Sequence, residues 1–322
     1  MHHDIIVVGG GVAGLSSALF IARQGSNVLV LSQDLGGQLN LIPRLENYPG
    51  IILTSGELLA RTLEQQVLTF GGKIRYERVE KVDAIDDGFK VISNDREYTC
   101  KALILALGKV PRELGVEGER RFLGRGLTYA TKSEAPFYQG RVVATTGVGN
   151  YLVESALLLS RFARKVYVIY RTSKMAGDKE MIEALERKDN IEYVPNSEVI
   201  AIDGDERLRS ITLRDQSGGT KRLDVDGLFV EMGYKVYIDF VKHLVRINQR
   251  GEIEVNEYCE TSYKGIFAAG DATSVPYKQV IVAAGEGAKA AISAYNYLQR
   301  LAGKPGIKAD WRKSIGAEVY NF

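Results

Sequence analysis

The chain has 322 residues, of which 45% are hydrophobic and 25% are charged, and its formal net charge is +2. This composition is typical of a globular protein long enough for two domains. A charge so near neutral, with no run of lysine or arginine, argues against nucleic acid as a partner. No apolar run reaches the length of a membrane span and the N-terminus lacks the apolar core of a signal peptide, so we expect a cytoplasmic protein.

The first residues have the pattern of a dinucleotide-phosphate site. Residues 4–8, apolar from Ile5 to Val8, predict a buried strand. Glycines 9, 11 and 14 predict a tight turn, and residues 15–24 predict a helix. Without a Cβ the backbone can turn sharply and let a pyrophosphate approach, and the helix N-terminus offers N–H groups. A second strand, 27–32, follows at the distance of a βαβ unit, which favours a nucleotide site over a plain turn.

Further along, residues 56–70 predict an amphipathic helix, residues 73–100 alternate as antiparallel strands do, and residues 101–106 predict another strand. A strand at 141–146, a turn at 147–150, a helix at 151–162 and a strand at 165–170 then repeat the opening plan. A strand ending in Gly270 and Asp271 and a helix at 280–301 return to the first unit.

The predicted fold class is therefore α/β, with two Rossmann-like (three-layer ββα/βαβ) nucleotide-binding domains, one inserted in the other. We place the first part of the outer domain at residues 1–112 and its second part at 239–303. The inserted domain, NAD(P)-binding-like, takes 113–238, and an aromatic C-terminal tail takes 304–322.

The chain has two cysteines, Cys100 and Cys259, each in a strand-like segment. No CxxC occurs in the sequence. We interpret the two as buried thiols rather than a redox pair, with their distance in space left open. No metal site is predicted.

The end of the second predicted strand lacks the acid that often binds an adenosine ribose. Ser32 and Gln33 stand there, and a hydroxyl or an amide can make the same hydrogen bond. Two loop-forming clusters follow at 36–39 and 46–50, where an α/β scaffold places either ligand contacts or simple turns.

Together these motifs resemble the low-molecular-weight thioredoxin reductases, two-domain FAD flavoproteins of the pyridine-nucleotide disulfide oxidoreductase group. The resemblance covers nearly the whole chain and is carried by residues 9–14, 36–39, 46–50, 147–154, 265–271, 279 and 283–285. It implies a homodimeric FAD oxidoreductase in which Asp271 hydrogen-bonds the ribityl or pyrophosphate region, with a helix cap or turn as the alternative role. The helix that opens near Gln279 would point its N-terminus at the flavin pyrimidine. The residues implied to hold FAD are Gly9, Gly11, Ala13, Gly14, Ser32, Gln33, Gly37, Gln38, Leu39, Asn47, Ala106, Gly108, Gly270, Asp271, Lys278, Gln279 and Val280.

The chain departs from that family at the dithiol. The family uses a CxxC beside the flavin, where one thiolate attacks a substrate disulfide. Ala130 and Ser133 occupy the two cysteine positions here, so the dithiol relay is chemically unavailable and the catalytic residues are unknown. Glu134 falls where the family has an acid, as a proton donor or as a solvated carboxylate.

The inserted nucleotide site departs as well. Gly147, Gly149 and Asn150 keep the start of the turn, but Leu152 fills the third small position and opposes close helix packing. Where the family has an arginine cluster for the NADPH 2′-phosphate, the chain has Arg171 and Lys174, and no acid stands in the run to favour NADH. We expect weakened or lost NAD(P)H binding, the alternative being ordinary drift in a working site.

The C-terminal tail, residues 308–322, is longer than is usual in the family. It resembles the tails of the thioredoxin-reductase-like ferredoxin–NADP reductases, which also lack the CxxC. Tyr48, Trp311, Tyr320 and Phe322 are candidates to stack on the flavin or on a second planar ligand, either a second flavin or another aromatic molecule. Plain packing at a dimer interface is the equal alternative.

The sequence thus predicts an FAD-dependent oxidoreductase that exchanges electrons directly at the flavin. Its partner would be an electron-transfer protein (ferredoxin or flavodoxin) or a small-molecule acceptor, and with NAD(P)H as donor it would be a ferredoxin- or quinone-type reductase. A non-catalytic flavin-binding or sensing protein is the alternative of a different class.

Overall fold

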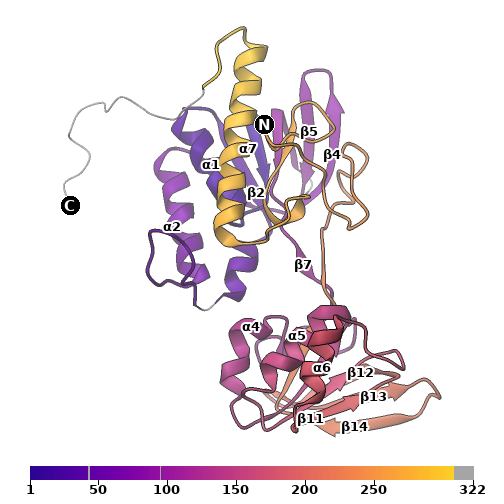
Figure 1. Ribbon diagram of the computed structural model, residues 1–322. Coiled ribbons are helices and arrows are strands. Elements are labelled where there is room, and N and C mark those ends of the chain that lie inside the picture. The colour runs from indigo at the N-terminus through magenta and orange to yellow at the C-terminus, as the bar shows by residue number, and fades with distance from the viewer. Residues whose placement is uncertain (43, 95, 308–322) are drawn as a thin grey trace. The chain divides into compact units, whose positions relative to one another are not determined.

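The computed structural model describes residues 1–42, 44–94 and 96–307, which form two compact units (Figure 1). Unit 1 contains residues 1–40, 45–108 and the described chain from 236 onward. Unit 2 contains residues 109–235 together with Leu41–Arg44. Unit 1 is therefore discontinuous in sequence, and unit 2 is inserted into it.

Unit 1 is built on a sheet of strand order β3-β2-β1-β6-β5-β4. The apolar strand β1 (His2–Val8) lies parallel to β2 (Val28–Ser32), which lies parallel to β3 (Lys73–Tyr76). The long strand β6 (Arg96–Leu105) pairs with β1 on one edge; its other edge is shared by the antiparallel β5 (Gly88–Ser93) and the parallel β17 (Ile266–Ala268). β4 (Val79–Ile85) completes an antiparallel hairpin with β5.

Three helices of unit 1, α1 (Val12–Arg23), α2 (Gly56–Thr69) and α7 (Val280–Leu301), lie beside one another in Figure 1. Small residues let α1 and α7 approach closely, since a Cβ added to Gly287 would lie 2.1 Å from the carbonyl oxygen of Ala13. The Ser17 hydroxyl lies 2.8 Å from the carbonyl oxygens of both Ala13 and Gly287. This contact places the N-terminal half of α7 beside the first turns of α1.

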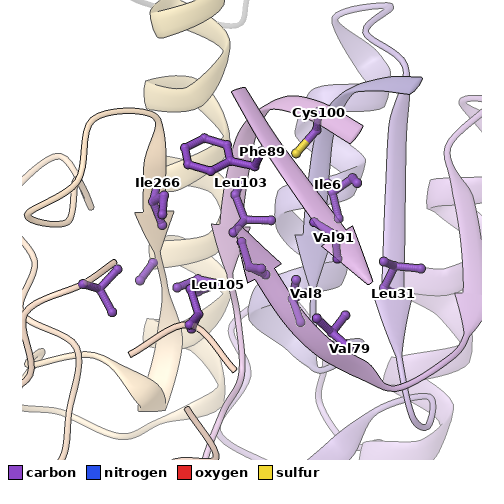
Figure 2. Packing of buried hydrophobic residues seen from close by; sticks show 14 of the residues in the cluster. Ile6, Val8, Leu31, Val79, Phe89, Val91, Cys100, Leu103, Leu105 and Ile266 are labelled. Carbon is purple, nitrogen blue, oxygen red and sulfur yellow. The ribbon is translucent and has the colours of Figure 1, made fainter. Parts of the chain in front are cut away.

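The apolar core on the other side of the sheet is closed by β4 and β5. Figure 2 shows Val79, Phe89 and Val91 of these strands packed with Ile6 and Leu103 of the sheet. All five side chains are buried, with at most 6% of their surface exposed. Unit 1 is therefore a three-layer arrangement of helices, parallel strands and an antiparallel hairpin.

Unit 2 contains a parallel sheet of order β11-β10-β9-β15-β8. Its strands are β8 (Leu127–Thr128), β9 (Val142–Gly147), β10 (Lys165–Ile169), β11 (Ile191–Val194) and β15 (Gly227–Glu231). Successive side chains of β15 pack into different hydrophobic cores, because side chains along a strand point alternately to the two faces of the sheet. Phe229 packs with residues of α5 (Gly149–Leu159) and α6 (Lys179–Glu186), whereas Leu228 packs with residues of β12 (Ser197–Gly204), β13 (Leu208–Asp215) and β14 (Thr220–Asp224).

Short elements complete the chain. They are the 3-10 turns η1 (Gly37–Leu41), η2 (Ala135–Tyr138) and η3 (Gly270–Ala272), the short helices α3 (Glu119–Phe122) and α4 (Thr131–Glu134), and the pair β7 (Val110–Pro111) and β16 (Tyr234–Lys235). Within the three described ranges, no helix is long and apolar enough to cross a membrane.

The predicted fold class is confirmed, and three details of the sequence reading are wrong. The segment 73–76 pairs in parallel with β2, because a strand's direction depends on its partner rather than on its own alternation. Residues 96–105 form one strand where we expected two. Cys259 has a φ of 62° and directly follows a turn, so it does not lie in a strand. The domain limits at 112, 238 and 303 stay predictions.

Candidate nucleotide sites

The first glycine-rich turn, in unit 1, has backbone contacts that leave no room for a side chain at Gly9 or Gly14. Gly9 has φ of 111°, and a Cβ there would lie 2.2 Å from the carbonyl oxygen of Ala106. A Cβ on Gly14 would lie 1.9 Å from the carbonyl oxygen of Gly9. At Gly11, the residue before α1, the nearest atom to such a Cβ is 3.7 Å away. The turn is therefore tightly packed at Gly9 and Gly14 and open at Gly11, where a pyrophosphate would approach the helix N-terminus.

Ser32 supports this turn. Its Oγ accepts a hydrogen bond from the N–H of Gly10 at 2.8 Å and donates to the carbonyl oxygen of Asp34 at 2.7 Å. The side chain is 9% exposed, so its hydroxyl joins the glycine turn to the end of β2. Of the two residues expected to meet the ribose, Gln33 is the exposed one.

Two loops and the start of α7 converge on the same turn of unit 1. The N–H of Gly36 donates to the carbonyl oxygen of Gly10 at 2.8 Å. The Gln38 amide donates to Asp271 Oδ2 at 3.3 Å, and the Asn47 amide donates to Gln279 Oε1 at the same distance. Gln279 is the N-cap of α7. These hydrogen bonds join the glycine turn to the loop at 36–38, that loop to Asp271, and the loop at Asn47 to the residue before α7.

The remaining predicted residues of this site have varied surroundings. Gly270 has φ of 76°, and a Cβ there would lie 2.9 Å from the Cβ of Ala13. Gly108 has φ of 60° with nothing within 4 Å of the equivalent position. Lys278 Nζ donates to the carbonyl oxygen of Thr273 at 2.6 Å and lies 3.3 Å from Glu252. The others are the buried Leu39 and the partly buried Gly37, Val280 and Tyr48.

The second glycine-rich turn, in unit 2, borders a cavity of about 120 Å³. Gly147 and Gly149 line it together with Leu152, Tyr170 and Arg171. Gly149, the first residue of α5, has φ of 58° and nothing within 4 Å of the position of a Cβ. The Asn150 side-chain oxygen accepts a hydrogen bond from the N–H of Asp178, the residue before α6, at 2.8 Å. The open backbone at the start of a helix fits a phosphate.

The other end of this cavity is charged. Arg171 Nη2 lies 3.1 Å from Glu198 Oε2, and Arg214 Nη2 lies 2.5 Å from Glu198 Oε1. These two guanidinium groups lower the pKa of Glu198. Thr172 Oγ1 donates to the carbonyl oxygen of Lys174 at 2.6 Å. Glu198 was missed by the sequence reading, since it comes from β12, outside the 170–176 run.

The segment that we expected at the family's dithiol positions is a short helical turn in unit 2. Ala130 precedes α4, and Ser133 lies within it. Burial raises the pKa of Glu134, opposed by its hydrogen bond to Thr128. Between Ala130 and Ser133 in the sequence lies the buried Thr131. Its Oγ1 is 2.5 Å from Glu231 Oε1 and 3.1 Å from Ser155 Oγ.

Glu231 is the second residue that sequence reasoning missed. It ends β15 directly across from Gly147, and the N–H of Val148 donates to its carbonyl oxygen at 3.1 Å. Burial raises the pKa of its carboxyl group to about 7. A glutamate closing an otherwise apolar strand was the available signal.

Both thiols lie in unit 1 and are buried. Burial raises the pKa of Cys100 to about 12, while burial and the Glu286 carboxylate, 3.1 Å from its sulfur, raise the pKa of Cys259. A thiol that keeps its proton is a poor nucleophile. Trp311, Tyr320 and Phe322 lie outside the described residues.

Two glycine-turn units of this kind, one inserted in the other, define a nucleotide-binding oxidoreductase of the two-domain flavoprotein class, and the cradle at Gly9–Gly14 fits the pyrophosphate of FAD. The chain belongs to the pyridine nucleotide-disulphide oxidoreductase family, whose model matches residues 3–287.

Relatives and solved structures agree. The chain is 35% identical to a thioredoxin reductase of Aquifex aeolicus over 96% of each chain. It is 34% identical to a thioredoxin reductase of Treponema pallidum, covering 93% of this chain and 98% of that protein. The crystal structure of a thioredoxin reductase from Streptococcus pyogenes is similar with a TM-score of 0.77 and 30% identity, over 93% of this chain and 99% of that one.

Proposed function

We propose that this protein is an FAD-dependent oxidoreductase of thioredoxin-reductase fold that works without a dithiol. The observation that carries the proposal is Ala130 and Ser133 at the positions that the family resemblance assigns to the dithiol. In addition, the two cysteines of the chain are buried and belong to the other unit. Bound FAD supplies the two-electron chemistry. Gly9, Gly11 and Gly14 would hold its pyrophosphate, and Gln38, Asp271, Asn47 and Gln279 would fix the loops around it.

Electrons would then enter and leave directly at the flavin, in a cytoplasmic homodimer that meets a ferredoxin, a flavodoxin or a small acceptor. An NAD(P)H-dependent reductase of ferredoxin or quinone type is the second candidate, favoured by the cavity between Gly149 and Arg171. The other class, a flavin-binding sensor without turnover, predicts bound FAD and no turnover with any acceptor.

The test is an anaerobic titration of the purified holoprotein with NADH and with NADPH, followed at the flavin absorbance band. Bleaching at stoichiometric reductant supports the reductase candidate; no bleaching, with rapid re-oxidation of dithionite-reduced protein by a ferredoxin or quinone, supports a donor other than NAD(P)H. Protein without FAD, or steady reduction of thioredoxin or an aromatic disulfide, would overturn the proposal.

A further inference from the structure

The charged end of the unit 2 cavity differs from a plain phosphate site, because its arginine already has an anionic partner. Arg171 and Arg214 contact the two different oxygens of the Glu198 carboxylate. Glu198 is the more enclosed member, with 29% of its side chain exposed against 64% for Arg171. Glu198 and Arg171 both line the cavity, so this carboxylate forms part of the cavity wall.

We propose that Glu198 is the specificity residue of this cavity and that it makes the site favour NADH over NADPH. The inference rests on unit 2 binding a pyridine nucleotide, as in the reductase candidate above. A free ribose 2′-hydroxyl can donate to a carboxylate, whereas a 2′-phosphate brings negative charge toward it and needs the same guanidinium groups.

The neighbouring residues do not replace the donors that Glu198 engages. The Thr172 hydroxyl donates to the Lys174 carbonyl, and Ala176 has no side-chain donor. Lys174 is an exposed single charge without the fork of a guanidinium group. A 2′-phosphate must therefore compete with Glu198 for Arg171.

The experiment measures the dissociation constants of NADH and NADPH on FAD-loaded protein by calorimetry, so that binding is read without turnover. We expect the wild type to bind NADH more tightly, and Glu198→Gln to shift the NADPH/NADH affinity ratio toward NADPH by about tenfold, as two part-exposed ion pairs allow. Adding Arg171→Ala to that variant should remove the gain.

Glu192→Gln is the matched control, because Glu192 is also ion-paired, with Lys165 at 2.7 Å, and does not line this cavity. A wild type that prefers NADPH, an unchanged ratio in Glu198→Gln, or no binding of either nucleotide by any variant would each overturn the inference. Failure of the proposed flavin function is read separately, as loss of the FAD absorbance band.

Discussion

Glu231 gives the sharpest test of the energetics of unit 2. Its carboxyl pKa is raised by burial from an ordinary 4.5 to about 7, with Glu154 raising it further and the Thr131 hydroxyl and Lys132 opposing the rise. At about 1.4 kcal/mol for each tenfold, this difference corresponds to at most about 3 kcal/mol, less what the partly exposed position screens.

The sign follows from where each state holds the proton. Below pH 4.5 the carboxyl is protonated in the folded and the unfolded chain alike, so it changes stability little. As the pH rises to about 7 the unfolded chain loses the proton first, so stability falls, and above about 7 the loss is complete.

We therefore expect Glu231→Gln to have a free energy of unfolding close to the wild type at pH 4 and up to about 3 kcal/mol higher at pH 8. The amide keeps an oxygen for the Thr131 hydroxyl, so the packing is retained. Urea unfolding followed by circular dichroism at both pH values measures the difference. The exposed Glu117→Gln is the control, and parallel pH profiles for Glu231→Gln and the wild type would refute the reasoning.

Three further predictions follow from buried contacts. Gly14→Ala should abolish FAD retention through gel filtration, because its Cβ would lie 1.9 Å from the Gly9 carbonyl oxygen, whereas Gly285→Ala, with nothing within 4 Å, should keep the flavin. Glu119→Ala should lower the free energy of unfolding by about 3 kcal/mol in urea titrations, because it strands the N–H groups of Leu114 and Gly115 and the hydroxyl of Tyr129, all within 2.8 Å of the carboxylate; a loss under 1 kcal/mol would contradict this. Both thiols should react with an aromatic disulfide reagent at least tenfold faster in urea than in the folded protein at pH 8, since they are buried and protonated; equal rates would exclude that account.

The parts of the fold that the sequence predicts well are those encoded by neighbouring residues. The helix predicted at 280–301 is observed as Val280–Leu301, because its apolar period is uninterrupted and Gly303 follows it. The glycine turn at 9–14 is similarly local. The direction of β3 and the unbroken length of β6 depend on partner strands, so alternation alone could not determine them.

The candidate site follows the same rule, since local glycine motifs are predictable from the sequence and contacts between distant residues are not. Gln38 and Asp271, whose side chains are hydrogen-bonded, lie 233 positions apart in the sequence, and only the family resemblance pointed to both. Glu198 and Arg171 belong to different layers of unit 2, so no local pattern connects them. The hydroxyl of Ser32 is bonded to the N–H of Gly10 and to the carbonyl oxygen of Asp34, contacts that no local pattern predicts, and its contact with a ribose stays a prediction.

The two glycine-rich turns also serve as a comparison within one chain. Between β1 and α1 three residues intervene, and Gly14 lets the helix touch the backbone of Gly9; between β9 and α5 only Val148 intervenes, and Leu152 is buried with 1% of its surface exposed. The leucine is thus accommodated by an earlier helix start, and the backbone at Gly149 stays open. A weak affinity for NADPH would then originate at Glu198 and Arg171, at the ribose end, rather than at the pyrophosphate turn, which is why replacing Glu198 and not Leu152 should restore it.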